Sequence, residues 1–304
     1  MQLEPEKLKK VLLIGLDFAG KTSILNVLTQ KYSLIADIKP TTRIERNIIS
    51  VLGIKIAIWD LGGQEKYRTE YLTAIRTFAE TNSFFFVVDM SHPERFELAL
   101  QYFLSILIII ESLGIQPKMV LCLHKIDQTL NNDVKTQELV KKATSLFLNN
   151  ARGHQIAVFN TSIYDIKSIV RAFSPTLQDL VKTLQPFKKI LESLVSQLKL
   201  EGIILFDETL MILGEFYNNK DCEEMCLNSV YNSVIELRSS DPQLHEENFP
   251  RNFEALLNRK AKEPRFGFLK VQFKDWNLYV LTIGKGKIDK NAISSLFNEI
   301  PLVS

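Results

Sequence analysis

Cysteine is scarce in this sequence, and its placement does not suggest a disulfide framework. The 304 residues include three cysteines, Cys122, Cys222 and Cys226. Cys122 falls in an apolar run typical of a buried strand, where a free thiol behaves as a small hydrophobic group. Cys222 and Cys226 stand one helical turn apart, but no further metal ligands follow at a suitable spacing. The cysteines therefore favour a reducing compartment, and we expect a cytoplasmic protein.

The sequence also lacks a large excess of charge and a long hydrophobic run. Its formal net charge is +2, which gives no global signature of polyanion binding, so we expect no nucleic-acid partner. The longest apolar block, Phe103–Ile110, falls well short of the roughly 20 residues that span a bilayer. No secretory signal is visible, so we expect no integral membrane segment. With 304 residues, of which 46% are hydrophobic, the chain has the length for about two domains.

A phosphate-binding pattern is what the sequence does contain. Residues 15–22 read Gly-Leu-Asp-Phe-Ala-Gly-Lys-Thr, between the apolar run Val11–Ile14 and the helix-like stretch Thr22–Leu28. The glycines let backbone N–H groups turn towards phosphates, and the helix N-terminus adds partial positive charge. Lys21 can reach the terminal phosphates, and the Thr22 hydroxyl can ligate Mg²⁺. A chance match in a glycine-containing turn is the alternative, which the flanking strand and helix disfavour.

A second polar segment follows another strand-like run. Asp60 ends the run Ile54–Trp59 and opens the sequence Asp-Leu-Gly-Gly-Gln. A carboxylate at a strand end can hold Mg²⁺ through a water molecule. Gly63 can offer its N–H group to a γ-phosphate, and Gln64 can orient an attacking water.

A third segment indicates which base is bound. The run Met119–Leu123 ends in His124-Lys125-Ile126-Asp127. The Asp127 carboxylate can accept paired hydrogen bonds from guanine, whereas adenine lacks that donor pair and would leave the carboxylate unpaired. The Lys125 stem can lie over the base, and a backbone N–H in Asn160–Ile163 could reach the guanine O6. Each motif stands at the carboxyl end of an expected strand, where ligands of open α/β sheets bind.

These motifs resemble those of Ras-superfamily small GTPases. The phosphate loop and residues 59–64 are similar to the Arf-like family, whereas residues 124–127 and 161–165 resemble the Rag/Gtr GTPases, in which histidine replaces the usual asparagine. Rag/Gtr chains carry a second domain of roadblock type. The resemblance therefore implies a G domain at 1–173 and a roadblock/longin-like dimerisation domain at 174–304.

The resemblance also implies the site residues. Catalytic roles fall to Gln64, Lys21 and Thr41, and Mg²⁺ ligation falls to Thr22, Thr41 and Asp60, with Thr42 as a competitor for the switch I threonine. Nucleotide contacts are implied for Asp17, Phe18, Ala19, Gly20, Lys21, Thr22, Ser23, Gly63, His124, Lys125, Asp127, Ser162 and Ile163. Position 2 is Gln2, so the glycine needed for N-myristoylation is missing.

The expected fold is α/β, with a P-loop GTPase domain and a smaller α/β domain. We predict a mostly parallel six-stranded sheet with flanking helices, ending in a short helix Ile166–Phe173 before a boundary at Pro175. An amphipathic stretch, Thr176–Leu200, should kink or break at Pro186. Beyond it we expect a hairpin, a helix at Glu223–Leu237, a polar connection, a second hairpin and a last helix at Lys290–Phe297. Any small α+β domain is the alternative interpretation of this second part.

The leading functional hypothesis is a GTP-binding switch with slow hydrolysis that uses GTP/GDP and Mg²⁺. The alternatives are a non-hydrolysing nucleotide-bound scaffold and, less favoured by Asp127, an ATP-dependent kinase or motor. Expected partners are a second copy or a related GTPase bound through 174–304, activating and exchange proteins, and roadblock/longin proteins. Membrane recruitment is expected only through such partners.

Overall fold

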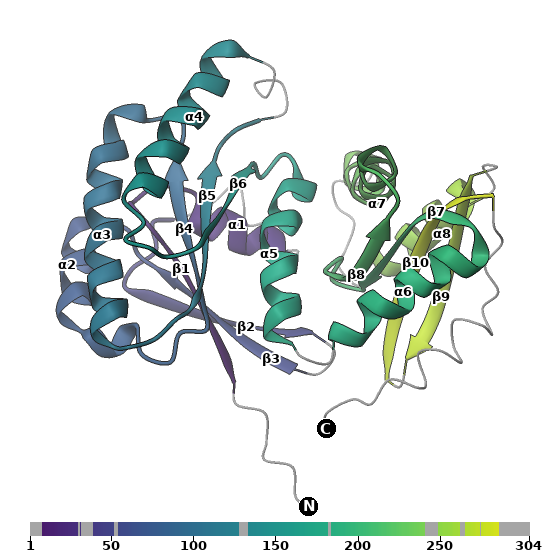
Figure 1. The fold of residues 1–304 in the computed structure, drawn as a ribbon, viewed down its shortest axis with the longest axis horizontal. Coiled ribbons are helices and arrows are strands. Elements are labelled where there is room, and N and C mark those ends of the chain that lie inside the picture. Colours follow the sequence, from purple (N-terminus) through teal and green to yellow (C-terminus); the bar gives the residue numbers. More distant parts are fainter. Residues whose placement is uncertain are drawn as a thin grey trace, which may run out of the picture. The chain divides into compact units, whose positions relative to one another are not determined.

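The structure, a computed structural model, describes residues 8–29, 31, 39–51, 54–127, 133–181, 184–240, 249–261, 265–273 and 275–285. These residues form two compact units that divide between Thr176 and Leu177 (Figure 1). We call the unit before this division the first unit and the one after it the second unit. Among the described residues, no helix combines the length and the apolar character needed to cross a membrane.

The first unit is built on a six-stranded sheet in the order β2-β3-β1-β4-β5-β6. The pair β2–β3 is antiparallel and every other pair is parallel, which confirms the predicted mostly parallel sheet. Its strands are β1 (Lys9–Gly15), β2 (Ile44–Val51), β3 (Ile54–Leu61), β4 (Ser83–Asp89), β5 (Lys118–His124) and β6 (Ile156–Thr161).

Helices cover both faces of this sheet, and the central strand β4 shows why. Its residues are all buried, as expected for a strand packed on two sides. Phe85 stacks on Phe173 of α5 with ring centroids 3.8 Å apart, whereas Phe86 contacts Phe103 of α3 and Phe147 of α4. Because successive side chains of a strand point to opposite faces, these rings form two hydrophobic layers. The helical elements are α1 (Lys21–Leu28), α2 (Glu65–Thr73), η2 (Ile75–Thr77), η3 (Pro93–Arg95), α3 (Phe96–Ser112), α4 (Val134–Asn149) and α5 (Ile166–Leu180).

The end of the first unit differs from the prediction. Helix α5 does not stop at Phe173 but runs to Leu180 with Pro175 inside it. A proline in a helix removes one backbone hydrogen bond and costs about 3 kcal/mol. Burial continues across it, since Val170 and Phe173 before the proline and Leu177 after it are all buried. The apolar periodicity therefore prevails over the proline, and the helix continues past Phe173. The domain bounds 1–173 and 174–304 stay a prediction.

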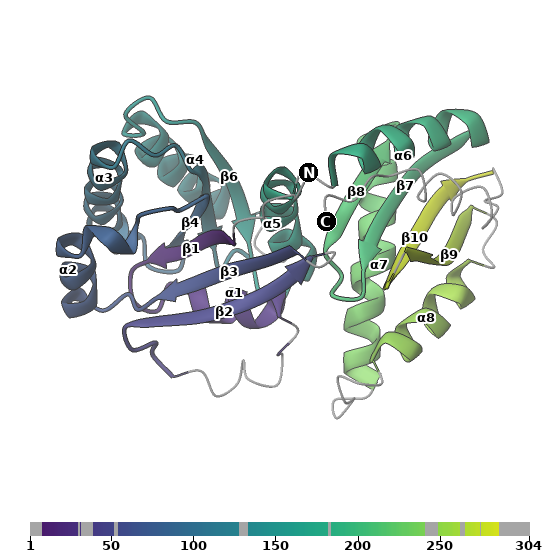
Figure 2. The same cartoon turned by 90° about the horizontal axis from the view of Figure 1, so that it is seen from below.

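The second unit has a four-stranded antiparallel sheet in the order β8-β7-β10-β9. Figure 2 shows helix α6 on one face of this sheet and helices α7 and α8 on the other. Contacts of α6 with β7 and β8, and of α7 and α8 with β7, β10 and β9, agree with this two-sided arrangement. The elements are α6 (Gln185–Leu198), β7 (Leu200–Asp207), β8 (Ile212–Tyr217), α7 (Lys220–Ser240), α8 (Phe249–Lys260), β9 (Phe266–Phe273) and β10 (Trp276–Gly284).

The positions of proline and of apolar residues explain which predictions for the second unit are confirmed and which are wrong. The interruption predicted at Pro186 is confirmed and is a break, because α5 ends at Leu180 and α6 begins at Gln185. The proline lies in the first turn of α6, where no backbone donor is needed. The prediction of a polar connection before the second hairpin is wrong in part, because helix α8 lies in this segment. The spacing of Phe253, Leu256 and Leu257, all buried, is the signal that identifies this helix. The helix predicted at Lys290–Phe297 lies outside the described residues.

Candidate functional site

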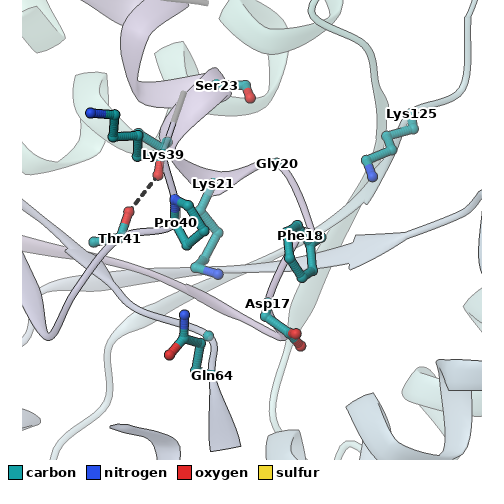
Figure 3. A pocket seen from close by; sticks show the side chains of 12 residues that line it. Asp17, Phe18, Gly20, Lys21, Ser23, Lys39, Pro40, Thr41, Gln64 and Lys125 are labelled. Atoms are coloured by element: carbon teal, nitrogen blue, oxygen red, sulfur yellow. Dashed lines mark hydrogen bonds between the residues drawn. The ribbon is translucent and has the colours of Figure 1, made fainter. Parts of the chain in front are cut away.

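The predicted phosphate-site residues gather around one cavity at the carboxyl ends of the parallel strands. Its volume is about 250 Å³, and Figure 3 shows side chains from the phosphate loop, the segment before β2, the start of α2 and the end of β5 surrounding it. Loops that are far apart in the sequence therefore share one space. The lining residues are Asp17, Phe18, Gly20, Lys21, Thr22, Ser23, Lys39, Pro40, Thr41, Gly63, Gln64 and Lys125.

The phosphate loop turns sharply from β1 into α1. Gly20 precedes the helix at φ 92°, and a Cβ atom there would lie 2.4 Å from Cδ2 of His124. Only glycine fits both the left-handed backbone and this close approach. Phe18 is also left-handed, at φ 59°, and its side chain is 69% exposed at the cavity rim. A bulky side chain in this conformation marks a strained position, as is common in binding loops.

Lys21 is held inside the phosphate loop. Its ammonium donates hydrogen bonds to the carbonyl oxygens of Gly15, at 3.2 Å, and Leu16, at 2.8 Å. Burial lowers the pKa of Lys21 to about 8, although the carboxylates of Asp60 and Asp17 act in the opposite direction. The side chain is therefore mainly a cation at neutral pH.

Three oxygen-bearing side chains meet beside the start of α1. The Thr22 hydroxyl lies 2.7 Å from the Thr41 hydroxyl and donates to Asp60 Oδ2 at 2.6 Å, and Thr41 donates to the same oxygen at 3.1 Å. The dashed line in Figure 3 is the hydrogen bond between the Thr41 and Thr22 hydroxyls. Thr42, the competing switch I threonine, is exposed. The structure therefore brings Thr41, and not Thr42, to the other two residues.

This cluster fits a magnesium ion. Among the described residues, Asp60 Oδ1 is the buried side-chain oxygen or nitrogen that has no hydrogen-bond partner. Burial raises the pKa of Asp60, against the charge of Lys21 and the hydrogen bonds from Thr22 and Thr41. A buried carboxylate in this condition is stabilised by a cation, and hydroxyl and carboxylate oxygens are the ligands that Mg²⁺ prefers. The described residues hold no group of three His, Cys, Asp or Glu side chains, Cys222 and Cys226 included, that could bind a metal.

Gly63 connects the second motif to the phosphate loop. Its carbonyl oxygen accepts a hydrogen bond from the Asp17 N–H at 3.0 Å, and a Cβ atom at Gly63 would lie 2.2 Å from that nitrogen. Gln64 follows in an extended conformation as the residue that caps α2. Its side chain lines the same cavity as that of Lys21 (Figure 3). The geometry thus places an amide where it can contact a water molecule in the cavity.

His124 lies beneath the phosphate loop rather than in the cavity lining. It is 1% exposed, and its Nδ1 lies 3.0 Å from the Thr161 hydroxyl. Burial, with a smaller effect from Lys125, lowers the pKa of His124 to about 4, so the ring is neutral at physiological pH. The His124 ring therefore packs closely against Gly20 and links the third motif to the phosphate loop.

The other residues of the third motif are paired with neighbouring loops. Asp127 Oδ1 accepts a hydrogen bond from the Ser162 hydroxyl at 2.5 Å, and Ser162 lies just before Ile163. Lys125 lines the cavity and donates to Asp89 Oδ2 at 2.7 Å. Burial alone would raise the pKa of Asp89, but hydrogen bonds from Lys125 and Ser91 outweigh it and hold that pKa below its usual value. Asp127, Ser162 and Ile163 do not line the cavity itself, and Ala19 is buried within its loop.

Sequence reasoning missed three charged residues around the site. Asp89 ends β4 and orients Lys125, and its position at a strand end was the available signal. Arg68 of α2 donates through Nε to the Gly63 carbonyl at 3.0 Å. Arg95, in the connection between β4 and α3, forms an ion pair with the Asp17 carboxylate. No local pattern marks either arginine, because each meets its partner only through the fold.

Comparison with known proteins places this geometry in a family. Residues 10–236 match the region described as "Gtr1/RagA G protein conserved region". The chain is 26% identical over 219 residues to GTP-binding protein gtr1 of Schizosaccharomyces pombe, an alignment that covers 70% of this chain and 69% of that protein. The solved Arl6 BBS3 small GTPase from Trypanosoma brucei is 19% identical, with a TM-score of 0.47, and covers 57% of this chain and 98% of its own. Since the family region spans most of the chain, the protein belongs to the Gtr1/RagA family of G proteins and is a GTP-hydrolysing small GTPase.

Proposed function

We propose that the protein is a GTP-dependent switch with slow hydrolysis, and that the predicted site residues carry the roles assigned to them. One observation supports this above the others. The phosphate-loop residue Lys21, the hydroxyl of Thr41, the carboxylate of Asp60 and the amide of Gln64 come from separate segments and converge at one edge of the sheet. Guanine-nucleotide binding follows from the family, and this convergence supports a triphosphate with its metal ion as the ligand.

In this proposal Thr22 and Thr41 hold Mg²⁺, with Asp60 behind them. The ion, when bound, neutralises charge that develops on the phosphate oxygens. Lys21 stabilises the same charge from the protein side, Gly63 donates its N–H to the γ-phosphate, and Gln64 orients the attacking water. Asp127 and Lys125 hold the base, with His124 supporting the loop from below and a backbone N–H at Ser162 or Ile163 reaching the guanine O6.

Release of the γ-phosphate would free the segments that depend on it. These segments are residues 31–45, of which 32–38 lie outside the described residues, and residues 62–72. Thr41 joins the site through the Thr22 hydroxyl, and Gly63 joins it through the Asp17 N–H. Loss of those contacts is an order–disorder transition of the kind that switches use. Neither Arg68 nor Arg95 lines the cavity. We therefore expect slow intrinsic turnover, with an activating protein supplying an arginine and an exchange protein reloading GTP.

Base selection tests the nucleotide assignment. Asp127→Asn should weaken GTP binding by roughly 10³-fold, because the guanine donor pair loses its carboxylate acceptor, and should favour xanthine nucleotides. Asp133→Asn is the matched control, since Asp133 caps α4 by accepting from the Thr136 N–H at 2.9 Å, and asparagine caps equally well. Competition binding with GTP, ATP and xanthosine triphosphate decides the matter. Unchanged base preference in Asp127→Asn would assign that residue another role.

For the remainder of the chain, we infer a roadblock/longin-like domain at 174–304 that pairs with a second copy or a related GTPase and with roadblock/longin proteins. The helix positions Val230 and Val234 are buried within the unit, which removes them as pairing surfaces. Of the described strands, β8 and β9 form the edges of the sheet, and edge strands present backbone groups for pairing. We therefore favour strand pairing, with about 1,600 Å² or more buried in a stable dimer. We also propose a cytoplasmic location, with any recruitment to membranes provided by such partners.

Light scattering tests this second proposal. The full chain, alone or mixed with a related GTPase, should scatter as a dimer, whereas a chain ending at Thr176 should scatter as a monomer. A monomeric full chain in both conditions would remove the assembly role.

A further inference from the structure

Arg95 holds one residue of the phosphate loop by two of its atoms. Its guanidinium pairs through Nη2 with the Asp17 carboxylate and donates through Nη1 to the Asp17 carbonyl oxygen at 3.2 Å. The arginine and aspartate side chains are 27% and 29% exposed, so the pair is partly shielded from water. A planar guanidinium that grips both a side chain and a backbone oxygen fixes geometry as well as charge.

Asp17 occupies a junction of the site. Its N–H donates to the Gly63 carbonyl at 3.0 Å, and its side chain lines the cavity together with Lys21 (Figure 3). The charges of Asp17 and Arg95 both act on the pKa of Lys21, Asp17 raising it and Arg95 lowering it, against a larger effect of burial. Both members of the pair therefore lie within electrostatic reach of the lysine that faces the phosphates.

A carboxylate in this position opposes the ligand that the cavity is proposed to take. Nucleotide phosphates are anions, and like charges brought together in a partly desolvated site repel one another strongly. GTP carries one more ionised phosphate than GDP, so an unpaired Asp17 would disfavour GTP more than GDP. A cation bonded to Asp17 cancels this discrimination against the triphosphate.

We propose that Arg95 is a positioning residue that neutralises and orients Asp17, and thereby sets the preference of the site for a nucleoside triphosphate over a diphosphate. The inference rests on the proposed function, because it presumes that this cavity holds guanine nucleotide. It concerns the ratio of two affinities and not the hydrolysis step.

The test is the affinity of the full chain for GDP and for a non-hydrolysable GTP analogue. Arg95→Ala should weaken binding of the analogue by about tenfold and binding of GDP by about threefold or less, and Arg95→Lys should recover part of the loss. Asp17→Asn in the Arg95→Ala background should restore the wild-type ratio, because the repelling charge is gone. Asp17→Asn alone should raise the affinity for the analogue relative to GDP, since Arg95 is then an unpaired cation.

Arg152→Ala provides the matched control. Arg152 also grips a carboxylate with two hydrogen bonds, at 2.9 and 2.8 Å from Glu111, but on an exposed surface of the same unit away from the cavity lining. Arg152→Ala should leave both affinities unchanged.

Equal weakening of the affinities for both nucleotides by Arg95→Ala, without recovery in the double variant, would overturn the inference and leave a purely structural ion pair. If Arg95→Ala fails to fold, a fall in the analogue-to-GDP preference of Asp17→Asn overturns it equally. Failure of the wild-type chain to bind either nucleotide would instead refute the proposed function.

Discussion

Each unit of this chain contains a buried carboxylate, and the two carboxylates differ in how fully they are hydrogen-bonded. In the first unit, Asp60 Oδ2 accepts hydrogen bonds from two threonines while Oδ1 has no partner among the described residues. In the second unit, Asp207 Oδ1 accepts from the N–H and hydroxyl of Thr209 and from the N–H of Met211, all within its own turn. Asp60 therefore has bonding capacity left for a ligand, whereas Asp207 closes the loop between β7 and β8.

Sheet topology explains this difference. The parallel sheet of the first unit brings the loops after β1, β3, β5 and β6 to one edge, so polar residues distant in sequence become neighbours. The antiparallel sheet of the second unit joins β7 to β8 by a short turn, whose polar groups bond to each other. Of the two buried carboxylates, Asp60 thus lies at the candidate site and Asp207 stabilises a turn.

Among comparisons between the two units, the largest expected effect concerns hydrolysis and compares two glutamines. Gln64→Leu should leave GTP binding near wild type but slow phosphate release by roughly 10²-fold with an activating partner present, because the attacking water loses its orienting group. Gln197→Leu, a change at an exposed side chain of α6 that bonds to Ser193, should do neither. Phosphate release and nucleotide binding are the measurements. Wild-type release by Gln64→Leu would show that the glutamine has another role.

The two buried carboxylates give the next contrast. Asp60→Asn should reduce Mg²⁺-dependent nucleotide affinity by about 10- to 100-fold with little loss of stability, because the buried charge serves the ligand. Asp207→Ala should leave that affinity unchanged but lower the free energy of unfolding by roughly 2–3 kcal/mol, since donors in its turn lose their acceptor. Nucleotide titrations with and without Mg²⁺, together with urea unfolding, separate the two outcomes. If both substitutions strongly changed both the nucleotide affinity and the free energy of unfolding, the two carboxylates would not differ in role.

The contributions of His124 and Asp207 to the pH dependence of stability should also have opposite signs. Burial lowers the pKa of His124 to about 4, so the folded state binds fewer protons, and its contribution is lost as pH falls from about 6.5 towards 4. Burial raises the pKa of Asp207 to about 6, so its contribution instead falls as pH rises from about 4 to 6. From pH 5 to 7, His124 should add about 2 kcal/mol and Asp207 should remove about 1 kcal/mol.

Non-titrating variants isolate these contributions. Urea unfolding gives the free energy of unfolding of each variant at pH 5 and 7. Relative to the wild type, its change from pH 5 to pH 7 should be smaller in His124→Asn and larger in Asp207→Asn. Profiles parallel to the wild type in both variants would mean that neither group titrates differently on folding.

The smallest effect distinguishes two adjacent threonines. Thr41→Ala should weaken binding of a GTP analogue by about fivefold while sparing GDP, since one hydroxyl ligand of about 1 kcal/mol is lost. Thr42→Ala changes an exposed residue and should alter neither affinity. Equal effects of the two substitutions on both nucleotides would remove Thr41 from the switch.

Much of the first unit could be predicted from the sequence, because its strands are apolar runs and its motifs follow them directly. The residues from Gly15 to Thr22, Asp60 and Asp127 stand at strand ends, so the topology alone brings them to one edge. The helix end predicted before Pro175 is wrong, because the apolar periodicity continues through Leu177 and outweighs the local effect of the proline. Arg95 could not be found, because its partner lies far away in the sequence and the connection that carries it has no distinctive pattern. In the second unit, α8 was missed although Phe253, Leu256 and Leu257 have helical spacing.

The most direct test of the central claim uses the purified wild-type chain. GTP and ATP binding should be measured with and without Mg²⁺, and phosphate release followed over hours. We expect GTP to bind at least roughly 10³-fold more tightly than ATP, with affinity that depends on Mg²⁺. Phosphate release should proceed at a rate on the order of 10⁻³ s⁻¹ or slower without an activating protein. Equal affinity for ATP and GTP, or binding indifferent to Mg²⁺, would contradict a GTP-dependent switch built on Asp127, Thr22, Thr41 and Asp60.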